Sequence, residues 1–274
     1  MALTLTYTGQ TAIPVEVEGL VPSALCDSSV KEIELFETFH GNRKLPLGEF
    51  FRVCGSLDDG ELVFDGDLSG VHWIGAGMDS GTIRVVGDAG RHVGSQMTGG
   101  EIYVEGNAGD WVGGEMHGGF IHIKGSAGHL IGAAYRGSAR GMTAGTILIG
   151  GDVGNEIGHT MRRGMLAIGG HCGDMAGFNM IAGSIFVFGN NGIRPGAAMR
   201  RGTIGLFGSD PPSLLPTFCR ATTFDPLYLQ IALRKLQLRG FSIGTEFFTR
   251  SYDLYHGDFI EGGRGEIIVR SCDW

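Results

Sequence analysis

The sequence has few cysteines, and none of them form closely spaced pairs. The five are scattered at Cys26, Cys54, Cys172, Cys219 and Cys272. A disulfide framework calls for an even, patterned set, and a structural zinc or iron–sulfur site calls for cysteines two or three residues apart. The spacing therefore indicates free thiols, as in a reducing compartment.

Positive charge is also scarce, and long apolar runs are absent. The 21 Lys and Arg against 29 Asp and Glu leave a formal net charge of −8, which lacks the electrostatic footprint of a nucleic-acid-binding protein. No run of about 18 apolar residues occurs, and the opening MALTLTYTGQ lacks the basic and apolar regions of a signal peptide. We expect no nucleic-acid or membrane partner and a cytoplasmic location.

Glycine, in contrast, is abundant and regularly spaced. The chain has 50 glycines in 274 residues without the three-residue period of collagen. A repeated pattern, G-x-I-x-V-x-G-x-x-G-x-x-x-G-x-x-M-x-x, starts at Gly60, Gly81, Gly100, Gly119, Gly145, Gly164, Gly183 and, incomplete, Gly202. Five of the seven spacings are 19 residues, and the 26-residue spacing carries seven extra residues within 135–143.

Each repeat opens with a five-residue alternation that is typical of a strand with one buried face. Ile102 and Val104 occupy the inward positions of one repeat, and Ile121 and Ile123 those of the next. One strand per 19 residues runs in the same direction every time, so equivalent strands stack in parallel about 4.8 Å apart. The fold class predicted is all-β, a right-handed parallel β-helix of about seven 19-residue coils, in which Ile102, Ile121, Ile147 and Ile185 share one ladder.

A methionine lies three residues before the next glycine in every coil. These residues are Met78, Met97, Met116, Met142, Met161, Met180 and Met199. A buried ladder that fills one corner of the core is the favoured interpretation, because the thioether is flexible and apolar. A thioether metal site is the alternative.

The outward strand positions become apolar in the later coils. Leu148, Phe186, Phe188 and Phe207 stand where a solvent face would be polar, so we expect a cover. The segment DPLYLQIALRKLQLRG predicts one helix, with Asp225 as N-cap, Pro226 in the first helical position and Gly240 just past the end. This helix is the favoured cover, and another subunit is the alternative.

The two ends should close the open ladders of a β-helix. Residues 1–59 contain short alternating runs, including Leu3–Tyr7 and Ile33–Phe36, which predict an irregular β cap. We expect three regions: a cap over 1–59, the β-helix over 60–208, and a helix and tail over 209–274 that pack on the β-helix.

No catalytic motif stands out. The Walker loop, the GxSxG elbow and HExxH are all missing, and the nine histidines occupy different coil positions instead of converging. We expect no catalytic residue and no metal site in this chain.

Two arginine pairs occupy equivalent positions two coils apart. They are Arg162, Arg163, Arg200 and Arg201, with Arg136 and Arg140 in the nearby seven-residue insertion. Three interpretations remain open: a solvated edge, a groove that binds an anionic carrier, or an interface with another subunit, since arginine pairs well with carboxylates.

The coils over 60–208 resemble the β-helical C-terminal domain of the large chain of glutamate synthase. With the lead-in LGEFFRVCG at 47–55 and the tail FFTRSYDLYHGDFIEGGRGEI at 247–267, the whole chain more closely resembles the C-type subunit of formylmethanofuran dehydrogenase. The Arg-rich, Lys-poor composition favours the related formyltransferase/hydrolase complex of methylotrophic bacteria.

The resemblance implies a non-catalytic scaffold in a complex that moves formyl units between tetrahydromethanopterin and a methanofuran-type carrier and yields formate. Its partners would be metallohydrolase-like, dehydrogenase-B-like and formyltransferase subunits, which carry the chemistry. It further implies that this chain binds no cofactor directly, and that a molybdenum or tungsten pterin lies on a neighbouring subunit only in the archaeal type of dehydrogenase.

Two other functions remain as alternatives. A stand-alone glutamate-synthase-like domain would end near the last coil, whereas this chain continues over 209–274. A β-helical carbohydrate-active enzyme would need paired carboxylates on neighbouring coils, and the outward strand positions offer only Glu105.

Overall fold

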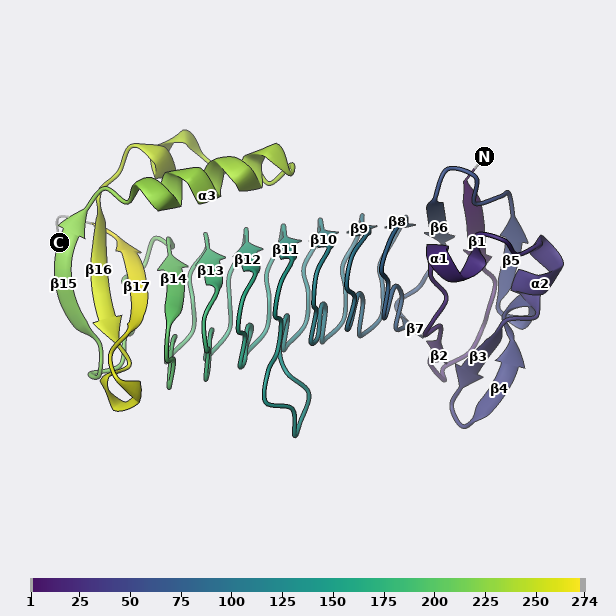
Figure 1. The fold of residues 1–274 in the computed structure, drawn as a ribbon, viewed down its shortest axis with the longest axis horizontal. Helices are drawn as coiled ribbons and strands as arrows, with labels where there is room; N and C mark the ends of the chain where they lie inside the picture. Colours follow the sequence, from purple (N-terminus) through teal and green to yellow (C-terminus); the bar gives the residue numbers. More distant parts are fainter. Residues whose placement is uncertain (1, 272–274) are drawn as a thin grey trace.

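The structure is a computed structural model that describes residues 2–271. Eight strands follow the repeat: β6 (Glu61–Asp65), β8 (Thr82–Val85), β9 (Glu101–Val104), β10 (Phe120–Ile123), β11 (Thr146–Ile149), β12 (Met165–Ile168), β13 (Ser184–Val187) and β14 (Gly202–Leu206). Each pairs in parallel with the next, and Figure 1 shows them in a row along the long axis of the molecule. They form most of a 13-stranded, mainly parallel sheet, so the prediction of an all-β chain is confirmed.

The inward strand positions form a continuous buried ladder. Ile102 lies opposite Ile121, which lies opposite Ile147, and Leu166 separates Ile147 from Ile185. All are fully buried, which confirms the predicted isoleucine ladder. The seven repeat methionines are fully buried as well, as predicted for a core ladder.

A polar ladder, which the sequence pattern did not predict, runs along the turn after each strand. The side chain of one repeat accepts a hydrogen bond from the backbone N–H of the equivalent residue in the next. Asp152 Oδ1 accepts from the His171 N–H at 2.6 Å, and His171 Nδ1 accepts from the Asn190 N–H at 2.9 Å. His129 has the same role in a second ladder, because its Nδ1 accepts from the Asn155 N–H at 2.9 Å. These histidines therefore tie repeats together.

The N-terminal residues extend this sheet and add a second one. The strand β1 (Leu3–Tyr7) pairs in parallel with β6 and antiparallel with β5 (Phe51–Cys54). The smaller, four-stranded sheet has the order β4-β3-β2-β7. The remaining elements of this region are β2 (Val15–Glu16), α1 (Pro22–Leu25), β3 (Glu37–His40), β4 (Arg43–Pro46), η1 (Leu47–Glu49) and β7 (Val71–His72).

The alternating run Ile33–Phe36 is not a strand. Residues Val30–Glu34 form the helix α2, which begins at a capping box. The Ser29 side chain accepts from the Glu32 N–H, and the Glu32 carboxylate accepts from the Ser29 N–H at 2.8 Å. This reciprocal pair satisfies the free amides of a helix start, so local capping outweighs the alternation.

The C-terminal residues continue the large sheet beyond the repeats. The strand β17 (Gly265–Arg270) pairs in parallel with β14, and β16 (Tyr252–Gly257) and β15 (Cys219–Phe224) follow it antiparallel. Two short 3-10 helices, η2 (Thr245–Phe248) and η3 (Phe259–Glu261), flank β16.

The predicted helix is α3 (Leu227–Leu238), and it begins one residue later than expected. Asp225 is not the N-cap, because Pro226 takes that position in an extended conformation with ψ 102°. The Pro226 carbonyl accepts the first helical bonds, from the N–H groups of Leu229 and Gln230 at 3.1 and 3.3 Å. Gly240 follows the end of the helix with φ 84°, as predicted.

The helix α3 covers the apolar outer face, as Figure 1 shows from the side. Leu229, Leu233 and Leu236 of the helix share one buried cluster with Phe120, Leu148, Ala167, Phe186 and Phe207 of the sheet. Phe188 is only partly buried and packs edge-on against Phe247, at 5.1 Å between ring centroids. The prediction of a covered face with this helix as its cover is confirmed.

Candidate functional site

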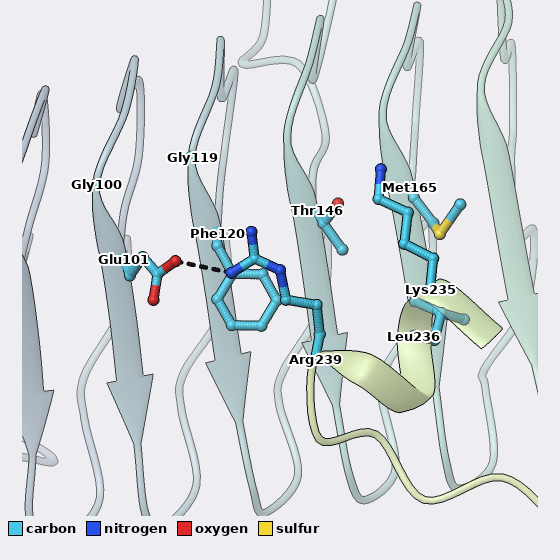
Figure 2. A pocket seen from close by; sticks show the side chains of 9 residues that line it. All are labelled: Gly100, Glu101, Gly119, Phe120, Thr146, Met165, Lys235, Leu236 and Arg239. Atoms are coloured by element: carbon cyan, nitrogen blue, oxygen red, sulfur yellow. Dashed lines mark hydrogen bonds and ion pairs between the residues drawn. The ribbon is translucent and has the colours of Figure 1, made fainter. Parts of the chain in front are cut away.

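Where α3 ends, it leaves a hollow of ≈ 430 Å³ against the outer face of β9–β12 (Figure 2). The lining residues are Gly100, Glu101, Gly119, Phe120, Thr146, Met165, Lys235, Leu236 and Arg239. Glu101, Phe120, Thr146 and Met165 are successive register partners on four neighbouring strands. The 19-residue repeat thus aligns a carboxylate, an aromatic ring, a hydroxyl and a thioether in one row beneath the helix end. We call this space the α3 hollow.

An ion pair fixes one end of the α3 hollow. Arg239 Nη1 lies 2.7 Å from Glu101 Oε1, and the guanidinium carbon lies 4.9 Å from the centroid of the Phe120 ring (Figure 2). The Tyr103 hydroxyl donates to the other oxygen of Glu101. These bonds, that of Tyr103 first and that of Arg239 second, lower the pKa of the Glu101 carboxyl. Glu101 is therefore an ionised anchor for the helix end.

The middle of the α3 hollow holds polar groups without an internal partner. The exposed Lys235 ammonium has no acidic group within ion-pair distance among residues 2–271, and the half-buried Thr146 hydroxyl makes no hydrogen bond to that part of the chain. In Figure 2 the Lys235 side chain leaves α3 and runs beside Met165. The α3 hollow therefore combines a free cation and hydroxyl with the half-buried Met165, whereas Phe120 and Leu236, which also line it, are almost fully buried.

A second candidate is the surface that carries the predicted arginines. Arg162, Arg163, Arg200, Arg201 and Arg264 line one hollow of ≈ 290 Å³, together with Ile181 and Ala182. Arg162 and Arg163 also line a neighbouring hollow of ≈ 470 Å³ with His117, Arg140, Thr143 and Ala144. The structure brings the four predicted residues together on one face, which we call the arginine face.

Two features of the arginine face differ from the sequence pattern. Arg264 joins it because β17 pairs with β14, a long-range pairing that no local signal reveals. Of the insertion residues, Arg140 lines the face, whereas Arg136 lines neither hollow. Arg200 is paired with Glu261 at 3.4 Å. The face keeps a strong positive charge, because the other four arginines that line the first hollow have no acidic partner within 4.0 Å in the described residues.

An aromatic stack lies beside the insertion and was not predicted. The His92 ring stacks on Trp73 at 4.1 Å between centroids with an interplanar angle of 6°. Tyr135, the first residue of the insertion, stacks on Trp111 at 4.8 Å, and its hydroxyl lies 3.0 Å from His92 Nδ1 and donates to the buried Ser95 Oγ at 2.8 Å. Trp73, His92 and Trp111 occupy one repeat position, and each has φ 65°. The stack therefore anchors the base of the insertion.

The partly buried environment of His92 predicts that stability depends on pH. Burial first, and then repulsion from His72 and Arg91, lowers the pKa of His92 to about 4. An unfolded chain binds a proton at this site below about pH 6.5, so between pH 6.5 and 4 the unfolded state holds more protons than the folded one. We expect the unfolding free energy to fall by about 2 kcal/mol over that range, less than the full shift because the ring is partly exposed.

Urea unfolding at pH 7, 6, 5 and 4 measures this effect. A His92→Phe variant keeps an aromatic ring in the stack and removes the titration, so its stability should fall less with decreasing pH. An equal slope for the two proteins would contradict the assignment.

Some kinds of site do not occur in the part of the chain that the structure describes. Over residues 2–271, no group of three or more His, Cys, Asp or Glu side chains is placed to hold a metal ion. Cys26, Cys54, Cys172 and Cys219 are free thiols, and Cys272 lies outside the described residues. None of the described helices combines the length and apolar character needed to cross a membrane.

Comparison with known proteins identifies relatives of part of the sequence. No family model matches the chain. The C-type subunit of the molybdenum-containing formylmethanofuran dehydrogenase 1 of Methanothermobacter wolfeii is 44% identical over 79 residues, which are 28% of this chain and 20% of that protein. Its counterpart in the tungsten-containing formylmethanofuran dehydrogenase 2 of the same organism is 40% identical over 93 residues, 32% of this chain and 34% of that protein. The matches thus span a fifth to a third of these relatives.

A solved structure matches nearly the whole chain. It is a chain from the crystal structure of the formyltransferase/hydrolase complex of Methylorubrum extorquens in complex with methylofuran. The TM-score is 0.91 and the sequence identity 33%, over 98% of this chain and 100% of that one. As the repeat and its flanks predicted, the chain belongs to the family of C-type subunits of formylmethanofuran dehydrogenases and formyltransferase/hydrolase complexes.

Proposed function

We propose that this chain is a non-catalytic scaffold subunit of a formyltransferase/hydrolase complex. In this proposal the complex moves formyl units between tetrahydromethanopterin and a methanofuran-type carrier and yields formate. The observation that carries the proposal is the structural match over the full length of a chain from such a complex, at 33% identity. The chemistry would belong to metallohydrolase-like, dehydrogenase-B-like and formyltransferase subunits in the cytoplasm.

The apolar surface of the C-terminal region supports a scaffold. Leu227, Ile231 and Leu238 are exposed on α3, and Phe259 and Ile260 are exposed on η3. They place large apolar side chains on the surface of two separate C-terminal elements. Such groups are more typical of a protein–protein interface than of a free surface.

The architecture proposed for this scaffold is a right-handed parallel β-helix of about seven 19-residue coils over 60–208. Residues 1–59 would form an N-terminal β cap, and the helix and tail over 209–274 would pack on the β-helix. The parallel pairing of successive repeat strands and the isolated bridges Leu68–Ala89–Ala108–Ala127 between successive turns support this arrangement. The rigid row of strands would hold partner subunits at fixed distances.

Cofactors are proposed to lie outside this chain. The carrier would serve active sites on neighbouring subunits, and a molybdenum or tungsten pterin would occur only in a dehydrogenase of the archaeal type, as in the relatives named for those metals. A stand-alone glutamate-synthase-like domain and a β-helical carbohydrate-active enzyme remain the competing functions.

Purification of the native complex through a tag on this chain tests the scaffold proposal. Native mass analysis should give an assembly with several other subunits, including formyltransferase and metallohydrolase-like chains. Recovery of this chain alone, or only as copies of itself, would contradict it.

The arginine face is proposed to bind either an anionic carrier or another subunit. Its five arginines around one hollow carry positive charge on a protein whose net charge is −8, and the apolar Ile181 and Ala182 lie between them. A charge-assisted contact of arginine is worth about 1.5–3 kcal/mol when it is shielded from water and far less when exposed.

The double variant Arg162→Glu/Arg200→Glu should separate the two roles. A carrier site would lose about tenfold or more in carrier affinity while assembly survives, and an interface with another subunit would lose that subunit from the native complex. Arg43→Glu/Arg52→Glu is the matched control, since both residues are exposed in the N-terminal region. Unchanged assembly together with unchanged carrier kinetics at low salt would contradict both roles. The arginines would then form a solvated edge that contacts only water.

A further inference from the structure

The α3 hollow has a composition that the scaffold role does not explain. Its volume of ≈ 430 Å³ lies within the usual range of small-molecule sites, roughly 300–1,000 Å³. Such sites combine an apolar lining with a few polar groups that fix orientation. Here the half-buried Met165 supplies most of the accessible apolar part, since Phe120 and Leu236 are almost fully buried, and Lys235 and Thr146 supply the polar part.

The charged residues of the α3 hollow indicate whether a ligand bound there would be an anion or a cation. Lys235 and Arg239 carry two positive charges, and Glu101 carries one negative charge, so one positive charge is left over. Arg239 and Glu101 neutralise each other at 2.7 Å, which assigns the unbalanced charge to Lys235. A single anionic group therefore fits beside Lys235, whereas a cation would meet no free carboxylate.

The other side chains of the α3 hollow indicate which groups of a ligand could lie beside its anionic group. Phe120 is almost fully buried, and one face of its ring is already occupied by the Arg239 guanidinium at 4.9 Å. Met165 is half-buried on β12, so its thioether can contact a flat apolar group. The Thr146 hydroxyl lies on β11, between the strands that carry Phe120 and Met165, and can donate a hydrogen bond to an oxygen there.

We propose that the α3 hollow binds a small organic carboxylate. Its apolar body lies against Met165 beneath the helix end, and its carboxylate is held by the Lys235 ammonium and the Thr146 hydroxyl. Arg239 and Glu101 position the helix end and do not hold the ligand. This site is separate from the arginine face and does not depend on the scaffold role.

The test is a titration of the whole chain with 4-fluorobenzoate, followed by fluorine NMR, with neutral 4-fluorobenzamide as the comparison ligand. We expect the benzoate to bind at least tenfold more tightly than the amide, because only the benzoate pairs with Lys235. Capped glutamate, acetyl-Glu-amide, has the carboxylate of a protein side chain without the flat apolar body. It should bind at least tenfold more weakly than the benzoate.

Two variants assign the effect to residues. Lys235→Gln should weaken benzoate binding about tenfold and leave the amide unchanged, and Thr146→Val should weaken it several-fold while preserving shape. The matched control is Arg234→Gln, which removes the same charge from the neighbouring exposed residue of α3 outside the hollow. Equal binding of benzoate and amide, equal binding of capped glutamate, or an equal loss in Arg234→Gln would overturn the proposal.

Discussion

Phe186→Asp should prevent stable folding or destabilise the protein by about 4 kcal/mol or more. Phe186 is fully buried between β13 and α3, and its ring lies 6.1 Å from that of Phe207 at an interplanar angle of 17°. Its register neighbours on the adjacent strands are Ala167 and Gly205, so no basic side chain lies beside it in the sheet. A carboxylate there would be desolvated and unpaired, or protonated at a similar cost.

The conservative variant Phe186→Leu separates charge from volume. It keeps an apolar side chain under α3 and should lower the unfolding free energy by only about 1.5 kcal/mol. Urea unfolding followed by circular dichroism compares the two proteins. A normally stable Phe186→Asp protein would show that α3 does not cover this face in solution.

Gly118→Ala should destabilise the protein by about 2–4 kcal/mol, although it adds one methyl group. A Cβ at Gly118 would lie well under 3.0 Å from the Thr98 carbonyl oxygen of the preceding repeat, closer than real Cβ atoms come. The atoms that the new Cβ would meet all belong to the Thr98 backbone, so no flexible side chain can move aside. The spacing of the two repeats would have to change. The glycine is required here by the close approach of two turns.

Gly70→Ala is the matched control for this prediction. A Cβ at Gly70 would meet nothing within 4 Å, and the residue is exposed. Its unfolding free energy should stay within about 0.5 kcal/mol of the parent protein. Equal losses from the two variants would mean that glycine acts through backbone entropy rather than through the approach of the repeats.

The repeat made most of the large sheet predictable. The positions of Ile121 and Met116 hold a large aliphatic residue and a methionine in every unit, mostly 19 residues apart, and this period is sufficient to place them in shared ladders, because each repeat meets only its neighbours. The apolar outer face could also be predicted, because Phe186 and Phe207 lie at positions that the alternation assigns to solvent. The helix α2 was not predicted, because the capping box of Ser29 and Glu32 determines the local structure there and outweighs the alternation around Ile33.

The candidate sites were predictable only in part. Arg162 and Arg200 share a repeat position, so their common face follows from the period. The ion pair of Arg239 with Glu101 joins residues 138 positions apart, and it exists because α3 folds back over the sheet. The repeat pattern does not indicate which repeat a residue outside it will contact. The α3 hollow and the position of Arg264 therefore could not be predicted from the sequence and are seen only in the three-dimensional structure.

Formyl turnover by the isolated chain is the most direct test of the scaffold role. The folded, metal-free chain should show no formyltransferase, hydrolase or dehydrogenase activity above buffer, whereas the native complex purified through it should turn over the formyl carrier. The comparison uses one assay, one carrier concentration and equal molar amounts of this chain. Turnover by the isolated chain at a rate near that of the complex would contradict the account, because the active site would then lie in this subunit.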